Sequence, residues 1–396
     1  MIISNKQANK LSSNSYLVVG VDFWLMISVI CLIAIGITMV ASSSFAIAEK
    51  YNHDAFYYLK RHIIFISIGI ALSSIILAMK MDWMQHLSRI FIVIAILLLI
   101  LVLFPGFGVK INGARRWINL GIARFQVVEA VKLAMIVYLA GYIVRHKQGL
   151  QHKFFSVIKP LLLSVLLSFL LLLQPDFGSA VLLMIITLFM IYMAGARYRD
   201  LFILAIFSAS SMAILAKAEP YRMQRLNSFL NPWATPFDDG FQLVQALIAI
   251  GSGKVSGIGI GGSVQKLFYL PEAHTDFIFS VFAEEMGFIG VICLVVIYVI
   301  FISRIFSISK EAFNNGKEFA AFSCAGIGVW LALQTFLSMG VNLGLLPTKG
   351  LTLPFISSGG SAILMNLLSL AIVMRVSYEN RKHNLKAIRK HSEVLI

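Results

Sequence analysis

Long apolar runs separated by short polar segments dominate the chain. A helix needs about 20 mostly apolar residues to cross a bilayer. Ten runs meet this pattern and predict membrane spans at residues 22–46, 62–79, 88–105, 126–144, 158–174, 178–195, 200–216, 276–302, 319–345 and 359–376. The expected fold is therefore an all-α integral membrane protein, a polytopic bundle of about ten transmembrane helices with both termini on one side.

Two polar tails flank the predicted transmembrane domain of residues 22–376, and a large extracytoplasmic loop is expected within it. Residues 1–21 predict an N-terminal tail, and 377–396 predict a basic C-terminal tail. A large loop, 217–275, separates spans seven and eight. Its stretch 241–250 is amphipathic, and we expect it either to lie flat on the membrane or to re-enter it. A break between spans five and six, with Pro175 and Gly178, predicts a tight hairpin.

Composition supports a membrane protein. The 396 residues are 59% hydrophobic and 13% charged, whereas soluble domains carry about 25% charged residues. The three cysteines lie in apolar runs, which favours core positions over a disulfide framework or metal site. The formal net charge of +15 is spread between apolar spans, with no soluble domain to hold a nucleic-acid groove. An anionic lipid or membrane surface is the expected partner, not nucleic acid.

The distribution of lysine and arginine favours cytoplasmic termini, since short cytoplasmic loops are enriched in these residues. One external loop is an exception, with a cluster of cations and little acid to balance them: Lys110, Arg115, Arg116 and Arg124. Contact with lipid phosphates and recognition of an external anion both explain this cluster.

Asp276 follows Pro271-Glu272-Ala273-His274-Thr275 at the point where a polar loop enters span eight. A helix N-cap would explain an aspartate there. Desolvation at a water–lipid boundary would also raise the pKa of its carboxyl, as a general base requires. The sequence leaves both interpretations open.

Ionisable residues also occur within spans, where they are costly and usually face a bundle interior or cavity. Glu129 and Lys132 are three residues apart and share a helix face. They predict either a structural ion pair or a polar floor beneath an external cavity. Glu284 and Glu285 lie about two turns into span eight, and one of them is expected to pair with Lys132 or with a basic loop residue.

Three further loops carry candidate chemistry. Lys349 is followed by Gly350, and a second group of hydroxyls and glycines comes at 357–361; this combination suits phosphate binding, although an ordinary loop also explains it. Gln174 and Asp176 flank a turn-forming proline. The glycine-rich stretch 257–262 follows no strand, so it predicts a flexible or re-entrant segment and not a dinucleotide site.

Taken together, these stretches resemble the SEDS (shape, elongation, division and sporulation) family of peptidoglycan polymerases over nearly the whole chain. The motifs that carry the resemblance are Asn112-Gly113-Ala114-Arg115-Arg116-Trp117, Gln174-Pro175-Asp176-Phe177-Gly178, Phe229-Leu230-Asn231-Pro232-Trp233, the 263–287 stretch and Leu346-Pro347-Thr348-Lys349-Gly350. The segment 263–276 resembles the cell-division branch, because the elongation branch usually has a basic residue where Ala273 stands.

Two departures from the family pattern are visible. Val127-Val128 stands where the family usually has Pro-Ser, and Ser358 stands where it usually has an aromatic residue. The first loses a helix-start proline, and the second loses an aromatic near the expected cavity. Neither removes the candidate acid or the cations.

The resemblance implies a peptidoglycan glycosyltransferase that polymerises lipid II outside the bacterial plasma (inner) membrane, at the division septum, and releases undecaprenyl pyrophosphate. Asp276 matches the family's essential acid and would be the general base. Arg115, Arg116 and Lys349 would balance the leaving pyrophosphate, and a divalent cation such as Mg²⁺ or Mn²⁺ is a further candidate. The other residues expected to bind substrate are Glu129, Lys132, Gln174, Asp176, Lys266, His274 and Ser358.

The resemblance also implies a partner, a class B penicillin-binding protein (an FtsI-like transpeptidase), together with other divisome membrane proteins. Two other functions fit parts of the sequence. A lipid II flippase would use the intramembrane acids and Lys132, and a division scaffold would need no chemistry. The specific acid-and-cation cluster at the outer boundary favours the polymerase.

Overall fold

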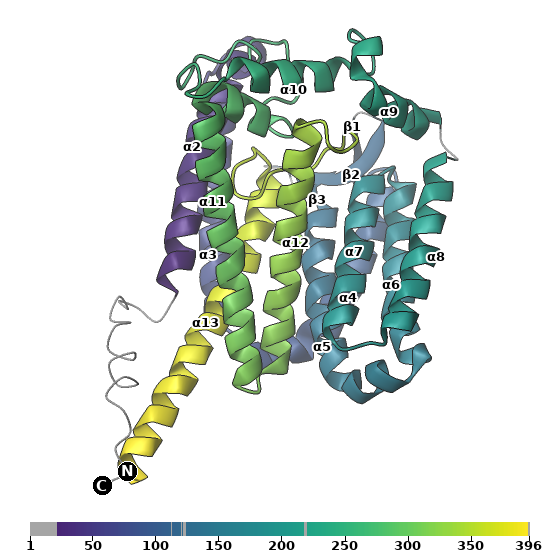
Figure 1. Ribbon diagram of the computed structural model, residues 1–396, viewed down its shortest axis with the longest axis vertical. Coiled ribbons are helices and arrows are strands. Elements are labelled where there is room, and N and C mark those ends of the chain that lie inside the picture. The colour runs from purple at the N-terminus through teal and green to yellow at the C-terminus, as the bar shows by residue number, and fades with distance from the viewer. Residues whose placement is uncertain (1–21, 112, 120, 122–123, 218–219, 395–396) are drawn as a thin grey trace.

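The computed structural model describes residues 22–394 apart from 112, 120, 122–123 and 218–219. Its long helices run side by side, with smaller elements gathered at one end (Figure 1). The long helices are α2 (Phe23–Asn52), α3 (Tyr57–Ala78), α4 (Met81–Leu103), α5 (Val127–His152), α6 (Phe154–Leu173), α7 (Phe177–Met193), α8 (Tyr198–Lys217), α11 (Ile278–Asn314), α12 (Glu318–Asn342) and α13 (Gly360–Val394). Each of the ten predicted spans coincides with one of them. Within the described residues, eight helices are long and apolar enough to cross a membrane, and α7 is a shorter apolar helix.

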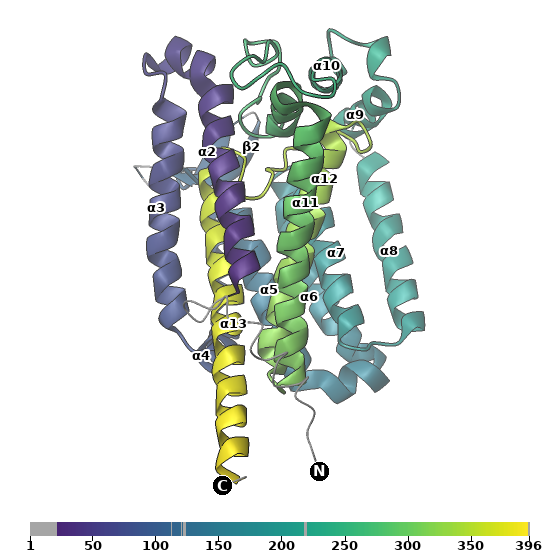
Figure 2. The same ribbon diagram turned by 60° about the vertical axis from the view of Figure 1, so that its left-hand side comes forward.

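Helix α2 begins and α13 ends at the same end of the bundle (Figures 1 and 2), as an even number of crossings requires. Helix α13 does not stop near residue 376, where the last span was expected to end, but continues to Val394. The tight hairpin expected between spans five and six is present, because α6 ends at Leu173 and α7 begins at Phe177.

The opposite end of the bundle carries the shorter helices of the 217–275 loop. These are α9 (Pro220–Leu230), the 3₁₀ helix Pro232–Ala234 and α10 (Phe241–Ser252). Helix α10 lies across the end of the bundle, steeply inclined to α11 (Figure 1). Its apolar face, which includes Leu243 and Ala246, is buried. The amphipathic stretch 241–250 therefore lies across the bundle, as the flat orientation predicted.

A small sheet that the sequence analysis did not predict lies at this same end. It consists of β1 (Gly108–Ile111), β2 (Ala114–Asn119) and β3 (Arg124–Gln126), antiparallel in the order β1-β2-β3. Pairing of this kind satisfies backbone groups that could not remain unpaired beside the hydrocarbon region. The sheet places Arg115 and Arg116 on its central strand.

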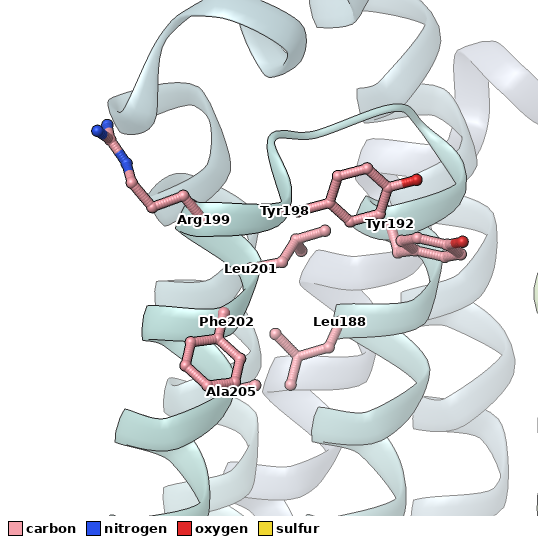
Figure 3. Close-up of a pocket in the computed structure, with 7 residues that line it drawn as sticks. All are labelled: Leu188, Tyr192, Tyr198, Arg199, Leu201, Phe202 and Ala205. Atoms are coloured by element: carbon pink, nitrogen blue, oxygen red, sulfur yellow. The ribbon is translucent and has the colours of Figure 1, made fainter.

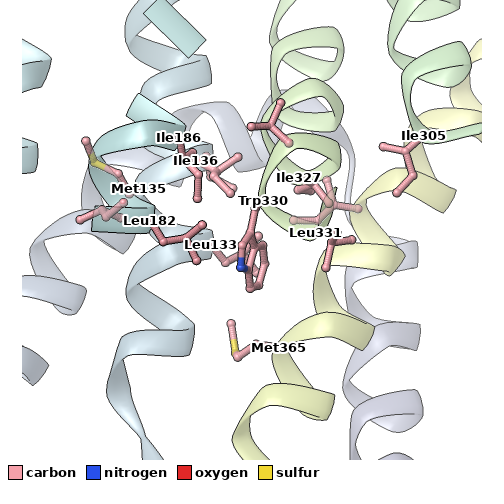
Figure 4. Close-up of a cluster of buried hydrophobic side chains, with 14 of the residues drawn as sticks. Leu133, Met135, Ile136, Leu182, Ile186, Ile305, Ile327, Trp330, Leu331 and Met365 are labelled. Atoms are coloured by element: carbon pink, nitrogen blue, oxygen red, sulfur yellow. The ribbon is translucent and has the colours of Figure 1, made fainter. Parts of the chain in front are cut away.

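Helices α5 and α12 form the centre of the bundle. In α5, 83% of the apolar window is buried, compared with 17% in the peripheral α3. Trp330 of α12 packs among Leu133 of α5, Leu182 of α7 and Met365 of α13 (Figure 4). Polar groups on these two helices are therefore shielded from lipid and must find partners inside the protein.

Helix α11 is interrupted at Gly287, whose φ is 65° and ψ is −169°. The glycine-rich segment pairs with the backbone at this interruption. Ile258 and Gly259 donate N–H bonds to the carbonyls of Glu284 and Glu285 at 3.1 and 3.0 Å. In the other direction, Phe288 and Ile289 donate to Lys254 and Val255 at 3.0 and 3.2 Å. The glycine-rich stretch is therefore fixed against a break in the helix.

The segment between α12 and α13 descends into the bundle. Phe355 is 1% exposed, and its ring lies 5.5 Å from that of Phe301, well along α11. A methyl group on Gly36 of α2 would stand 2.5 Å from the Phe355 carbonyl oxygen. Side chains satisfy the carbonyls of this segment, with Tyr298 Oη donating to Pro354 and Gln334 Nε2 to Thr352. This is the arrangement that irregular backbone requires at membrane depth. We call residues 346–359 the re-entrant loop.

Candidate functional site

Asp276 lies two residues before α11, where three segments meet. Its carbonyl oxygen accepts a hydrogen bond from Asn342 Nδ2 at 3.0 Å, at the end of α12. The preceding carbonyls of Thr275 and His274 accept bonds from Ser357 Oγ (2.7 Å) and from the backbone N–H of Ser358 (3.0 Å). The re-entrant loop and α12 thus hold the backbone of 274–276 from one side.

The N-cap explanation for Asp276 does not hold. The N-cap position of α11 is Phe277, which makes no side-chain capping hydrogen bond. Instead, the Asp276 carboxylate lies against Gly350 of the re-entrant loop. A methyl group added to that glycine would stand 2.9 Å from Oδ2. The carboxylate therefore lies beside the re-entrant loop and does not cap its own helix.

The local environment raises the pKa of Asp276 from its ordinary value near 4 to about 7. Burial is the largest cause, and the charge of Glu272 adds to it. The cations Arg116 and Arg225 act in the opposite direction. A carboxyl with a pKa near 7 exchanges its proton readily at neutral pH, as a general base must.

Cations reach this region from three separate segments. Arg116, on β2, donates from its guanidinium to the backbone carbonyls of Gln174 (2.9 Å) and Pro175. Arg225, on α9, donates to the Thr348 carbonyl at 3.4 Å. Lys349 comes from the re-entrant loop, directly before Gly350. The charges are therefore supplied by the sheet, the large loop and the re-entrant loop.

Lys349 is partly buried and crosses the start of α7. Its ammonium lies 5.2 Å from the centre of the Phe177 ring. Burial lowers the pKa of Lys349, and the charge of Asp176 opposes this effect. Arg115 is more peripheral and donates to the Leu103 carbonyl at 3.4 Å. Of the two adjacent arginines, Arg116 is the one that acts electrostatically on Asp276.

The side chains of Gln174 and Asp176 hold the α6–α7 turn in place. Gln174 is 1% exposed, and its amide donates to the Leu99 carbonyl at 3.2 Å. Asp176 caps α7 by accepting bonds from the backbone N–H and hydroxyl of Ser179, at 3.2 and 2.9 Å. These contacts fix the turn whose backbone carbonyls accept hydrogen bonds from Arg116.

His274 is buried two residues before Asp276. Its ring lies 4.6 Å from that of Tyr58, and Nδ1 has no hydrogen-bond partner among the described residues. Burial lowers the pKa of His274, while Glu272 opposes the shift. Burial therefore favours the neutral imidazole. Ser358 contributes its backbone N–H to the His274 carbonyl.

Lys266 lies in a buried cluster with Glu285 and Ser42. Its ammonium bonds Glu285 Oε1 and Ser42 Oγ, both at 2.8 Å. Glu284 accepts from the hydroxyl of Ser263 and, at 3.2 Å, from the N–H of Val264. Both acids therefore anchor the loop before Asp276. Of the two partners expected for this acid pair, the structure shows the basic loop residue and not Lys132.

Glu129 and Lys132 form an ion pair in the bundle centre, 2.8 Å apart. The Lys132 side chain is 0% exposed and also bonds Gln334 Oε1 at 2.9 Å. Gln334 in turn accepts a hydrogen bond from Trp330 Nε1 and donates one to the carbonyl of Thr352 in the re-entrant loop. The geometry is that of the predicted structural ion pair, connected through Gln334 to the loop that carries Lys349.

The described residues contain no group of three His, Cys, Asp or Glu side chains placed to hold a metal ion. These residues therefore do not by themselves form a site for the divalent cation that the resemblance suggested.

A separate groove of about 580 Å³ lies between α7 and α8 (Figure 3). Apart from Arg199 its lining is aromatic or aliphatic, and it includes Leu188, Tyr192, Tyr198 and Phe202. It lies at the C-terminal end of α7, whereas the residues around Lys349 are at the N-terminal end. The groove is therefore not part of the Asp276 site.

Sequence reasoning missed Asn342 and Arg225 as parts of this site. It noted Gly350 and Ser357 only in loops suited to phosphate binding, and not as neighbours of residues 275–276. Asn342 had a usable signal, because a polar amide within the apolar run 319–345 needs an internal partner. The places of Gly350 and Arg225 depend on how far the re-entrant loop descends and where α9 lies.

Comparison with known proteins is consistent with this geometry. Residues 23–382 match the family model FTSW_RODA_SPOVE, described as cell cycle protein. The chain is 46% identical to the probable peptidoglycan glycosyltransferase FtsW of Thioalkalivibrio sulfidiphilus, over 90% of both chains. It is equally identical to the protein of that name from Coxiella burnetii, over 90% of this chain and 96% of that one.

Two solved structures share the fold. One belongs to a peptidoglycan synthase complex that coordinates polymerization and crosslinking; it has a TM-score of 0.73 and 27% identity over 91% of this chain and 98% of that chain. The other is the rod shape determining protein RodA of Thermus thermophilus, with a TM-score of 0.66 and 26% identity over 90% and 96%.

Proposed function

This chain belongs to the FtsW/RodA/SpoVE family of cell cycle proteins, and we propose that it polymerises lipid II into glycan strands with Asp276 as the general base. It is a multi-pass membrane protein and a peptidoglycan glycosyltransferase. The observation that supports the role of Asp276 is its position: a half-buried carboxylate with a pKa of about 7, held between the re-entrant loop and α11.

In this mechanism Asp276 removes the proton from the acceptor sugar hydroxyl. The hydroxyl oxygen then forms a bond to the anomeric carbon of the donor, and the bond from that carbon to the pyrophosphate breaks. The proton stays on Asp276, and undecaprenyl pyrophosphate leaves with its electron pair. A pKa near the working pH favours both uptake and later release of the proton.

The leaving pyrophosphate needs positive charge in place before the bond breaks. Arg116, Arg225 and Lys349 supply it from three segments around Asp276. Arg116 is already oriented by the α6–α7 turn, so little reorganisation is required.

The orientation proposed for the protein places both termini in the cytoplasm and the Asp276 end outside. Two observations support this topology. Helix α2 starts and α13 ends at the same end of the bundle, and the loops at that end carry an excess of lysine and arginine. The site of action would be the division septum, in line with the resemblance of residues 263–276 to the cell-division branch. The partner would be a class B penicillin-binding protein, in line with the synthase complex that coordinates polymerization with crosslinking.

A lipid II flippase is the competing function. It would use charged groups free to face a path through the membrane. Here Lys132 is enclosed by Glu129 and Gln334, and Glu285 is paired with Lys266. The test is to supply purified protein and its transpeptidase with labelled lipid II, and to measure both glycan chains and lipid transport in vesicles. Chains are expected; transport without chains would overturn the proposal.

A further inference from the structure

We propose that Asn342, at the end of α12, is a positioning residue for Asp276. Its side-chain amide holds the backbone of Asp276 and thereby fixes the position of the Asp276 carboxylate. This inference rests on the function proposed above. It assigns no contact between Asn342 and the substrate. The effect of Asn342 on the reaction is instead exerted through the geometry of Asp276.

All the hydrogen-bonding capacity of the Asn342 amide is used. Nδ2 donates to the carbonyls of Asp276 (3.0 Å) and Ser338 (2.8 Å). Oδ1 accepts from the backbone N–H of Ser280 (3.1 Å) and from its hydroxyl (2.8 Å). An amide has two donors and one acceptor oxygen with two lone pairs, so one orientation satisfies all four contacts. Turning the amide over would set oxygen against two carbonyls.

The position of these contacts matters because the first N–H groups of a helix lack partners within that helix. Helix α11 receives no cap from a neighbouring side chain of its own among the described residues. Asn342 supplies a side-chain acceptor to the Ser280 N–H from another helix, in addition to the Phe277 carbonyl that the same N–H reaches at 3.0 Å. The same side chain binds the Asp276 carbonyl, so it joins the residue before the helix to the first turn within it.

The neighbouring residues His274 and Thr275 are held by other contacts, so the hydrogen bond from Asn342 specifically restrains Asp276. His274 and Thr275 are held by the re-entrant loop through Ser358 and Ser357. Asp276 is the last of the three carbonyls and is held by Asn342, which is 0% exposed. Without the amide, the turn that carries the carboxylate could rotate away from Gly350 while the preceding two residues remained in place.

The chain offers a matched control at the other end of α11. Asn380 of α13 is also 0% exposed, and its Nδ2 donates to the Ile308 carbonyl of α11 at 3.2 Å. Both asparagines therefore supply a buried amide bond to the backbone at or beside α11. Only Asn342 does so at Asp276.

The experiment compares Asn342→Ala with Asn380→Ala in lipid II polymerisation, with the transpeptidase partner present. We expect Asn342→Ala to lower kcat about 10- to 100-fold, because misplacement of a reacting group by about 1 Å has effects of this size. KM should change less than about twofold. Asn380→Ala, which removes one buried amide bond, should also lower the melting temperature but keep its kcat.

The pH profile gives a readout that a purely structural role would not move. The charged groups that face Asp276 are Glu272, Arg116 and Arg225, and neither substitution removes any of them. When Asn342 is lost, the freed carboxylate regains water, and its pKa should fall from about 7 toward its ordinary value. The midpoint of the acid limb should therefore move to lower pH in Asn342→Ala and stay in place in Asn380→Ala.

Equal kcat and equal pH midpoints in the two variants would overturn the inference. If Asn342→Ala does not fold, Ser280→Ala provides the same test, since it removes one bond to the Asn342 amide. Its control is Ser309→Ala, a buried α11 serine bonded to the Ala321 carbonyl at 2.8 Å. An active Asp276→Asn would instead refute the proposed mechanism itself, whatever the Asn342 result.

Discussion

The carboxylate of Asp276 and the α-carbon of Gly350 are in close contact. A methyl group at Gly350 would lie 2.9 Å from Oδ2 and 3.6 Å from Cγ of Asp276. Lys349 directly precedes this glycine and directs its ammonium over Phe177. The re-entrant loop thus places Gly350, which has no side chain, beside the Asp276 carboxylate. It places the preceding Lys349 ammonium at the start of α7.

Gly350→Ala should therefore reduce polymerisation about tenfold or more, because the carboxylate must move to admit the methyl group. The rate per folded molecule is the quantity to measure. Gly251→Ala is the control, since no described atom lies within 4 Å of its added methyl group. Equal rates for the two variants would show that the contact has no part in the reaction.

The rate should fall as pH decreases through about 7, because only the ionised Asp276 accepts a proton. Glu272 raises the pKa of Asp276, so Glu272→Gln should move the midpoint to lower pH. Arg116 lowers that pKa, so Arg116→Gln should move the midpoint to higher pH. Initial rates measured from about pH 5 to about pH 9 would reveal both shifts. Shifts in the opposite directions would contradict the assignment.

The crossing of Gly257 and Gly287 should be essential for folding. A methyl group on Gly257 would stand 2.1 Å from the Glu285 carbonyl oxygen, and one on Gly287 would stand 2.2 Å from the Gly257 nitrogen. Alanine at either position should cost more than about 3 kcal/mol, since only backbone movement could relieve the contact. Melting temperature and yield after detergent extraction measure this loss.

Gly261→Ala separates the contact from the backbone conformation. Its φ of +84° is close to the +77° of Gly257, yet no described atom lies within 4 Å of its added methyl group. It should cost only about 1–2 kcal/mol, the usual strain of a left-handed conformation. Equal destabilisation of Gly257→Ala and Gly261→Ala would refute the crossing.

The Glu129–Lys132 pair should behave as a support for the re-entrant loop. Removing one charge leaves the other buried and unpaired, so Glu129→Gln and Lys132→Met should each cost about 3–5 kcal/mol. The double variant should recover most of this stability. A double-mutant cycle on melting temperature, with polymerisation measured beside it, tests the claim. Full stability of the single variants with lost activity would instead favour a direct role in substrate binding.

The hydrophobic pattern was sufficient to locate the membrane helices. Every predicted span falls on a helix, because an apolar run of this length has few other stable arrangements in a bilayer. The sheet at 108–126 was missed, although Asn112-Gly113 is a strong hairpin signal between alternating residues. The break of α11 at Gly287 was also missed, since hydropathy averages over residues and does not register a change in backbone partners.

The candidate site was only partly predictable. Asp276 and Lys349 stand out in sequence because polar residues flank apolar runs there. The contact of Gly350 with Asp276 and the link from Asn342 depend on how deeply the re-entrant loop and α12 pack. Such tertiary distances are not encoded in local patterning, and Lys266, which the sequence suggests for substrate, lies in the cluster with Glu285.

The most direct test of the account is polymerisation of purified lipid II by Asp276→Asn in the presence of the transpeptidase. Because burial raises the pKa of Asp276, the folded state favours its neutral form, and stability declines as pH rises from about 4 through 7. The neutral asparagine should therefore fold at least as well as the parent at pH 8, and Glu272→Gln controls for loss of a nearby charge. The account predicts glycan chains from the parent and from Glu272→Gln, and none from Asp276→Asn. Chains of normal length and rate from Asp276→Asn would contradict it.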